Sequence, residues 1–482
     1  MTLGGRLDSL HGGRAWMTNV ALCALGAVMV MLARQFVAEH ARFEIGFSGV
    51  AGWSAWVYVA AVMVVMTQPV NRWTAWIVVG IAVALRLAVV RAEPFLSSDI
   101  YRYVWDGVVQ HAGVNPYRYV PGDAALSYLR GPHQVVFDNI NRRDYARTIY
   151  PPVAQMIYWC VTLLSPTVTA MKVAMVGFEG VTVAGLMWLL RAMKRPVAEV
   201  LLYAWCPLAV WEVGGSGHVD AAVMAFVVVA LVFRYREWPV LTGVFLGLAV
   251  MTKFYPLVLL PALWMRREGK LGEWRMPAAM IAVVAAGYAV YASAGKLVAG
   301  FLFDYTKEEG IDSGSRFFAL DAVHRVPGLS GVPTGAFYLL AAVVMGGLSW
   351  WGWKVSVVGG LRVVWAHSSA KVRRMNGAPE WLKVAMGLAG ALMLLFSPHY
   401  PWYVLWLVPF FVLTPSLWLL VYLMGMFYLL TTPLGDGTSA RMFVLNEILY
   451  GAVGVAAVVG WAMGRWDLWR WVDLRREAKT LD

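Results

Sequence analysis

The residues best suited to chemistry lie at positions 97–107, which read SSDIYRYVWDG and follow directly on the apolar run 73–90. The two serines predict a helix cap, and a helix that begins at Asp99 places this carboxylate where the helix dipole favours its ionised form. Asp99, Arg102 and Asp106 then share one helix face, which we expect to be free for a substrate. An ionised carboxylate there could take a proton from a hydroxyl group. Two alternatives stay open, in which Asp99 is only a partner of the dipole and Asp106 pairs with Arg102 across one turn.

A second group of candidates lies in a glycine-rich turn at 214–220, which reads GGSGHVD. His218 and Asp220 are two positions apart, so on a helix they point to different faces and a shared metal ion is not expected. As separate groups at the start of a helix they suit contacts with hydroxyl or phosphate groups.

Two proline corners carry the remaining candidates. Lys253 and Tyr255 belong to the sequence KFYP, and His399 and Tyr400 belong to the sequence SPHYPWY at 397–403. A lysine among apolar residues needs an anion, and we favour a lipid phosphate over a protein carboxylate, both of which fit. His399 and Tyr400 either contact phosphate and sugar or form a rigid aromatic turn in the interfacial belt.

The chain that must position these residues has 482 residues, of which 60% are hydrophobic and 14% are charged. Soluble domains contain about 25% charged residues, and long continuous apolar runs recur here from end to end. We therefore expect an all-α, polytopic membrane protein rather than a β-barrel. Much of the net charge of +12 lies in short loops, as the positive-inside rule predicts, so nucleic acid is not an expected partner.

The apolar runs predict about twelve to fourteen spans in a single domain of residues 1–482. Basic segments are expected on the cytoplasmic side together with the N-terminus, namely 191–195, 234–236, 266–275, 371–374 and 470–479. Three stretches are short for a crossing. Residues 152–164 are expected to be re-entrant or interfacial, and 239–252 with 254–266 form either two crossings or one broken helix.

This topology places all the candidate residues on the extracytoplasmic side. A large loop at 91–151 and a second loop at 293–333 lie there, together with the glycine-rich turn, the two proline corners and a short loop at 433–441. Charges and helix breaks at membrane depth are costly, so their clustering on one face indicates a site.

The motifs occur in a characteristic order along the chain. They are SDIYRY at 98–103, the stretch 113–117, YPPVAQ at 150–155, the stretch 207–220, KFYP at 253–256 and SPHYP at 397–401. In this order they resemble the GT-C superfamily of integral-membrane glycosyltransferases, above all glycosyltransferase family 87 and the polyprenol-phosphate-mannose-dependent mannosyltransferases. The chain also looks like the catalytic subunit of the first GPI mannosyltransferase.

The resemblance implies a polyprenyl-phosphate sugar donor, inversion at the anomeric carbon, and a site on the extracytoplasmic face of the plasma membrane. It also implies an acidic base in the first large outer loop, which corresponds to Asp99. Many relatives carry two acids in adjacent or alternate positions, whereas position 101 here is tyrosine. We therefore expect neither a metal ion nor another cofactor.

The expected function is transfer of a hexose, mannose by resemblance, to a lipid-linked or cell-envelope glycan. The expected substrate-binding residues are Arg102, Asp106, His218, Asp220, Lys253, Tyr255, His399 and Tyr400. A lipid-linked-sugar transporter or flippase is the alternative. A transporter is expected to have charges near the midplane and repeated halves, and the sequence shows no such halves.

Overall fold

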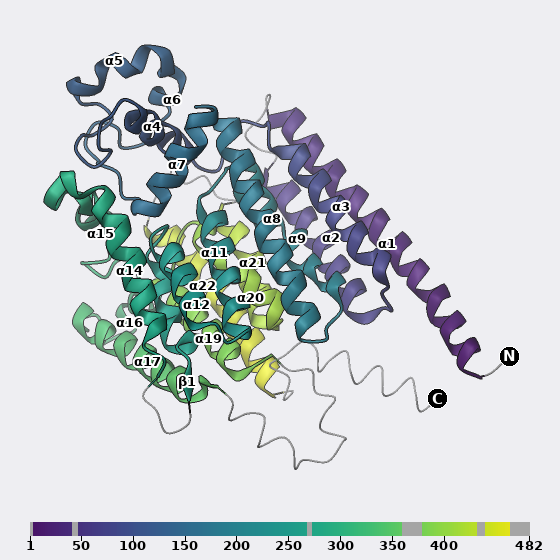
Figure 1. Ribbon diagram of the computed structural model, residues 1–482. Helices are drawn as coiled ribbons and strands as arrows, with labels where there is room; N and C mark the ends of the chain where they lie inside the picture. The colour runs from purple at the N-terminus through teal and green to yellow at the C-terminus, as the bar shows by residue number, and fades with distance from the viewer. Residues whose placement is uncertain (1–2, 41–46, 268–271, 359–377, 431–438, 463–482) are drawn as a thin grey trace.

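The computed structural model describes residues 3–40, 47–267, 272–358, 378–430 and 439–462, which form an elongated bundle of helices (Figure 1). The expected all-α, polytopic class is confirmed. Among the described residues, six helices are long and apolar enough to cross a membrane, and there are up to eight such spans if each of two bent pairs counts as one. Four shorter apolar helices accompany them. The count of twelve to fourteen spans stays a prediction.

The long helices carry large apolar side chains on their outer surfaces. They are α1 (Leu3–His40), α2 (Phe47–Thr67), α3 (Arg72–Val89), α8 (Val168–Ala192), α17 (Thr334–Val355) and α22 (Ser439–Ala462). Trp56 on α2 and Leu339 on α17, for example, are exposed. Apolar surface of this extent is what a helix presents to lipid.

The centre of the bundle is α11 (Asp220–Tyr235), most of whose side chains are buried. It packs between α8 and α12 (Pro239–Val250), and α12 packs in turn on α14 (Arg275–Val290). Three further pairs of helices complete the bundle, namely α1 with α3, α17 with α19 (Glu380–Phe396) and α21 (Leu417–Leu430) with α22. Asp220 therefore begins a long helix that is largely buried at the centre of the bundle.

The expected span 197–213 is bent rather than straight. Its first part consists of η3 (Val197–Val200) and α9 (Leu201–Ala204), and its second part of α10 (Pro207–Ala209) and the π-helix η4 (Val210–Gly215). The two parts meet at 57°. Pro207 begins the second part, where its missing N–H leaves no bond unmade.

The stretch 254–266, expected either as a crossing of its own or as part of one broken helix with 239–252, is not a continuous helix. This stretch contains only the 3₁₀ turn η5 (Tyr255–Leu259) and the single turn α13 (Leu260–Leu263) before β1 (Arg266–Arg267). The strand β1 pairs in parallel with β2 (Val357–Val358), and these two short strands are the β-structure of the described residues. The lysine corner thus interrupts a helix, because Pro256 and Pro261 both remove backbone donors.

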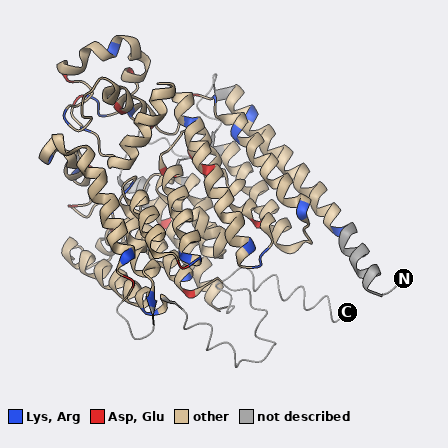
Figure 2. Ribbon diagram, in the orientation of Figure 1, with Lys and Arg blue, Asp and Glu red and all other residues tan. Residues whose placement is uncertain are grey.

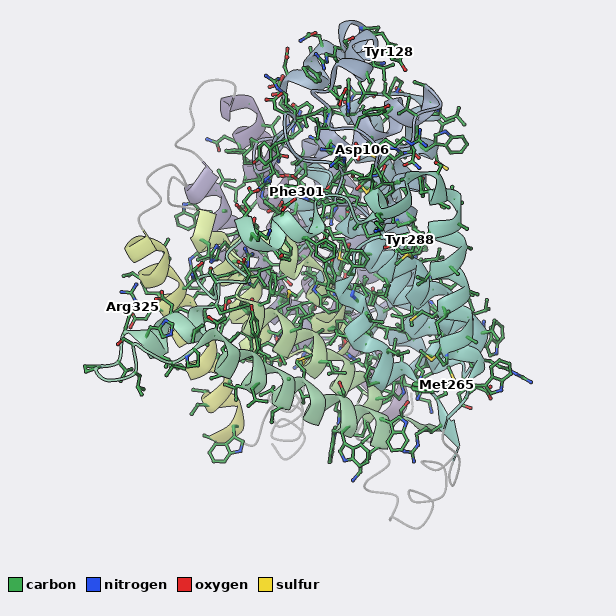
Figure 3. The ribbon with its side chains drawn as sticks, turned by 90° about the vertical axis from the view of Figure 1, so that its left-hand side faces the viewer. Asp106, Tyr128, Met265, Tyr288, Phe301 and Arg325 are labelled. Atoms are coloured by element: carbon green, nitrogen blue, oxygen red, sulfur yellow. The ribbon has the colours of Figure 1, made fainter. Side chains whose placement is uncertain are left out.

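The first expected loop covers one end of the bundle, and the beginning of the second expected loop lies toward the same end. The first contains α4 (Asp99–His111), η1 (Ala124–Leu126), α5 (Ser127–Arg130), η2 (Gly131–His133) and α6 (Gln134–Asp138), and α7 (Pro152–Leu164) follows it. The second contains η6 (Ala292–Ala299), α15 (Leu302–Glu308) and α16 (Phe318–His324). In Figure 3 the labelled residues Tyr128, Asp106 and Phe301 lie toward one end, Met265 lies toward the other, and Arg325 of the second loop lies between them.

The first loop has a small core of its own, so it is an ordered cap rather than a loose connection. This core contains Trp105, Val109, Leu126, Phe137 and Ile140. Lysines and arginines occur near both ends of the bundle (Figure 2). The basic segments 371–374 and 470–479, and most of the expected loop 433–441, lie outside the described residues, so the orientation in the membrane stays a prediction.

Candidate functional site

The helix α4 begins at Asp99, as expected from the sequence. Ser97 supplies the cap, because its Oγ accepts the backbone N–H of Asp99 at 3.2 Å, whereas Ser98 makes no side-chain cap bond. The Asp99 carboxylate is half-buried and accepts two hydrogen bonds, from Asn141 Nδ2 at 3.1 Å and from the Tyr150 hydroxyl at 3.2 Å. No salt bridge to Asp99 is found in the described part of the chain. Its oxygens therefore keep free lone pairs for a further donor.

A cluster of three tyrosines lies beside this carboxylate, and Tyr150 is the one that bonds to it. The Tyr103 ring lies parallel to that of Tyr158 at 4.6 Å and perpendicular to that of Tyr150 at 4.9 Å. Gly107 lets α4 approach α7 closely, since a Cβ at this position would lie 2.7 Å from the Tyr158 carbonyl oxygen. Burial raises the pKa of Tyr150 well above its ordinary value, and the charge of Asp99 raises it further. Tyr150 therefore stays protonated and donates its hydrogen bond to Asp99.

The expectation of a free polar face on α4 is wrong for Arg102 and Asp106. They are 6% and 2% exposed, and they form an ion pair with 2.7 Å between Nε and Oδ1. Asp106 also accepts a hydrogen bond from Gln155 at 2.8 Å, and Arg102 donates to the Ala146 carbonyl at 3.0 Å. The structure shows the alternative, in which Asp106 pairs with Arg102 across one turn of the helix. These two residues tie the first loop to α4 and α7.

Asp220 is the anion that compensates Lys253. Its carboxylate is fully buried and lies 2.5 Å from Lys253 Nζ, and it accepts the Tyr255 hydroxyl at 2.6 Å. The preference for a lipid phosphate as the partner of Lys253 is therefore not what the structure shows, and the protein carboxylate takes that place. Because Asp220 begins the buried helix α11, the three residues join the lysine corner to the centre of the bundle.

His218 is enclosed rather than presented as a separate contact. It is 1% exposed, its Nε2 lies 3.3 Å from a carboxylate oxygen of Glu212, and its ring stacks on Trp402 at 4.5 Å. Gly217 makes this turn possible, because its φ is +73° and a Cβ there would lie 2.3 Å from Ile100. The expected contact of His218 with a substrate would therefore need this region to open.

The corner at 397–403 continues the same stack of rings. Tyr400 is half-buried and lies over Trp402, with 4.6 Å between ring centroids. His399 is half-buried as well, and burial, helped by the charge of Arg316, lowers its pKa to about 4. His399 is consequently neutral at pH 7 and supplies no positive charge.

The second loop brings an arginine to this corner. Arg316 is 3% exposed, forms an ion pair with Glu309, and places its guanidinium 5.9 Å from the Tyr403 ring centroid. Its Nε and Nη2 have no hydrogen-bond partner. Arg142 of the first loop bonds to Glu308 at 2.6 Å and lies 3.8 Å from Glu309, so the two loops are joined by charges.

Burial raises the pKa of Tyr400, and the charges of Glu309 and Asp99 raise it further, while those of Arg142 and Arg316 lower it. All four charged groups therefore lie within electrostatic range of this tyrosine. Asp99 and the two arginines of the loops are therefore near enough to Tyr400 to influence its charge state. In the described residues, no three His, Cys, Asp or Glu side chains lie close enough together to hold a metal ion.

Four residues that contact the candidate groups were not predicted from the sequence as site residues: Asn141, Tyr150, Glu212 and Glu309. Tyr150 had a signal, since it opens the motif YPPVAQ, and Glu212 had one as an acid in an apolar run. Asn141 and Glu309 lie in charged loop segments that contain several equivalent polar residues, so nothing local distinguishes them.

Comparison with known proteins gives two overlapping matches. Residues 148–398 match the profile of glycosyltransferase family 87. Residues 9–267 match that of the N-terminal domain of the alpha-(1->6)-mannopyranosyltransferase family. No curated protein matches the chain significantly. Each profile covers about half of the chain, and their overlap at 148–267 contains Tyr150, Tyr158 and the lysine corner.

Proposed function

Because the chain belongs to glycosyltransferase family 87, we propose that it moves a mannosyl group from a polyprenyl-phosphate donor to a lipid-linked or cell-envelope glycan. The transfer inverts the anomeric carbon and takes place on the extracytoplasmic face of the plasma membrane. Sugar transfer itself follows from the family, and the match of residues 9–267 supports mannose. The proposal adds four points to the family assignment: the polyprenyl-phosphate donor, inversion at the anomeric carbon, Asp99 as the base, and a site on the extracytoplasmic face.

The observation that carries the proposal is the state of Asp99. Asp106 and Asp220 are buried and each is compensated by a cation, whereas Asp99 is half-buried and accepts only neutral hydrogen bonds. An uncompensated carboxylate with free lone pairs can accept the proton of an incoming hydroxyl. As the acceptor oxygen bonds to the anomeric carbon, the bond from that carbon to the phosphate oxygen breaks, and the proton passes to Asp99.

The leaving polyprenyl phosphate needs a positive charge rather than a proton. Lys253 is engaged by Asp220 and His399 is neutral at pH 7, so neither supplies this charge. Arg316 keeps two guanidinium nitrogens without partners close to Tyr403, and it best fits the phosphate oxygens. The remaining candidates then act by positioning these groups, namely Arg102, Asp106, His218, Asp220, Tyr255 and Tyr400.

The test is transfer from radiolabelled polyprenyl-phosphate sugars by purified Asp99→Asn protein. General-base help is worth about 10²–10⁴-fold, so we expect a loss of that size in transfer with an unchanged melting temperature. Asn141→Ala removes a hydrogen-bond donor to the same carboxylate and serves as the matched control, with a much smaller loss. Transfer by Asp99→Asn at the wild-type rate would refute the assignment of the base. Movement of the lipid-linked sugar across vesicles without transfer would favour a flippase.

A further inference from the structure

The backbone of residues 306–316 in the second loop places Glu309 beside Arg316. The helix α15 ends in a Schellman motif, in which Ile311 N–H donates to the Thr306 carbonyl at 2.9 Å and Gly310 has a φ of +66°. The turn is closed where Arg316 N–H donates to the Gly310 carbonyl at 3.2 Å. The backbone therefore sets carboxylate and guanidinium opposite each other without help from a ligand.

The ion pair leaves Arg316 incompletely satisfied. The side chains of Arg316 and Glu309 are 1% and 8% exposed, and the pair uses Nη1 of the arginine. The Nε and Nη2 atoms are buried and have no acceptor. Buried charged donors without partners are costly, so this arginine is poised for an anion with more oxygens than one carboxylate offers. A phosphate monoester has three such oxygens.

Glu309 has a second cation within reach. Arg142, on the first loop, lies 3.8 Å from its other carboxylate oxygen and already bonds to the neighbouring Glu308 at 2.6 Å. A small movement of the Glu309 side chain would therefore break its ion pair with Arg316 and form one with Arg142. The carboxylate would stay paired, and Arg316 would become free for a different anion.

We propose that Glu309 occupies the phosphate-binding position of Arg316 until the donor arrives, and that the donor phosphate displaces it toward Arg142. This inference rests on the proposed polyprenyl-phosphate donor and adds a regulatory contact to it. The empty site is kept neutral by an internal anion, and donor binding draws the two loops together through the pair of Arg142 and Glu309. Glu309 is thus a positioning residue that competes with the substrate.

The experiment measures binding of a short-chain polyprenyl phosphate to the purified full-length chain in detergent by isothermal titration, with the matching polyprenol as a phosphate-free control. Glu309→Gln removes the competitor, so we expect at least about fivefold tighter binding of the phosphate. Arg142→Gln leaves Glu309 on Arg316, and binding weakens. Asp304→Asn, which breaks only an exposed pair with Lys307 on the same helix, is the matched control and changes affinity by less than about twofold. Polyprenol binding is the same in all variants.

The double variant Arg142→Gln/Glu309→Gln separates competition from direct contact. It binds like Glu309→Gln if Arg142 acts through Glu309. A loss that persists in the double variant would show that Arg142 itself holds the phosphate, and would overturn the inference. Unchanged or weaker binding by folded Glu309→Gln would also overturn it.

If Glu309→Gln does not fold, Arg142→Gln decides the question, because the Arg142 side chain is partly exposed and tolerates replacement. Unchanged affinity of Arg142→Gln for the phosphate would then refute the inference. A wild-type protein that binds no polyprenyl phosphate refutes the proposed function as well.

Discussion

Replacing Lys253 by methionine tests whether this lysine belongs to the fold or to the donor. The change leaves Asp220 fully buried without its cation at 2.5 Å. Breaking a buried ion pair costs about 3–5 kcal/mol. The Tyr255 hydroxyl still donates to Asp220 at 2.6 Å, and a hydrogen bond to a charged group contributes about 1.5–3 kcal/mol. We therefore expect Lys253→Met to lower the stability by the smaller value for a broken buried ion pair, about 3 kcal/mol. In the double variant Asp220→Asn/Lys253→Met both groups are neutral, and most of the lost stability returns.

The assay is thermal melting of the detergent-solubilised protein at one fixed heating rate, together with the KM for the donor. We expect Lys253→Met to melt well below the wild type, and the double variant to approach it with a donor KM close to that of the wild type. The opposite pattern would refute this reasoning. A Lys253→Met protein that melts like the wild type but needs far more donor would place the lysine on the lipid phosphate.

Two further predictions concern Gly217 and His399. Gly217→Ala puts a Cβ 2.3 Å from Ile100, whereas Gly113→Ala meets no atom within 4 Å at a nearly equal φ of +75°. Gly217→Ala should therefore cost about 1–3 kcal/mol more than Gly113→Ala in thermal melts, and equal losses would show that the turn relaxes freely. The pKa of His399 is lowered from 6.5 to about 4, so the unfolded chain binds more protons between these values and the wild type loses stability as the pH falls through this window. His399→Gln should melt with a smaller loss between about pH 7 and pH 5, and a parallel loss in both proteins would contradict this origin.

Local interactions were readable from the residues alone. The start of α4 at Asp99 depends on Ser97, two positions before it, and the pair of Arg102 and Asp106, one of the two alternatives open from the sequence, depends on helical spacing. The all-α membrane class depends on the length and frequency of the apolar runs. In the first two cases the interacting groups lie within one or two turns, so their separation in the sequence sets their separation in space.

Only the tertiary structure decided which charges compensate one another. Lys253 and Asp220 are 33 positions apart, and Arg142 and Glu308 are 166 positions apart. A buried lysine demands an anion whatever its source, so the sequence could not choose between a carboxylate and a lipid phosphate. The packing of α11 against the lysine corner pairs Lys253 with Asp220, and the contact between the two loops pairs Arg142 with Glu308. They left Asp99 without a cation and Arg316 with donors to spare, and the proposed chemistry depends on both.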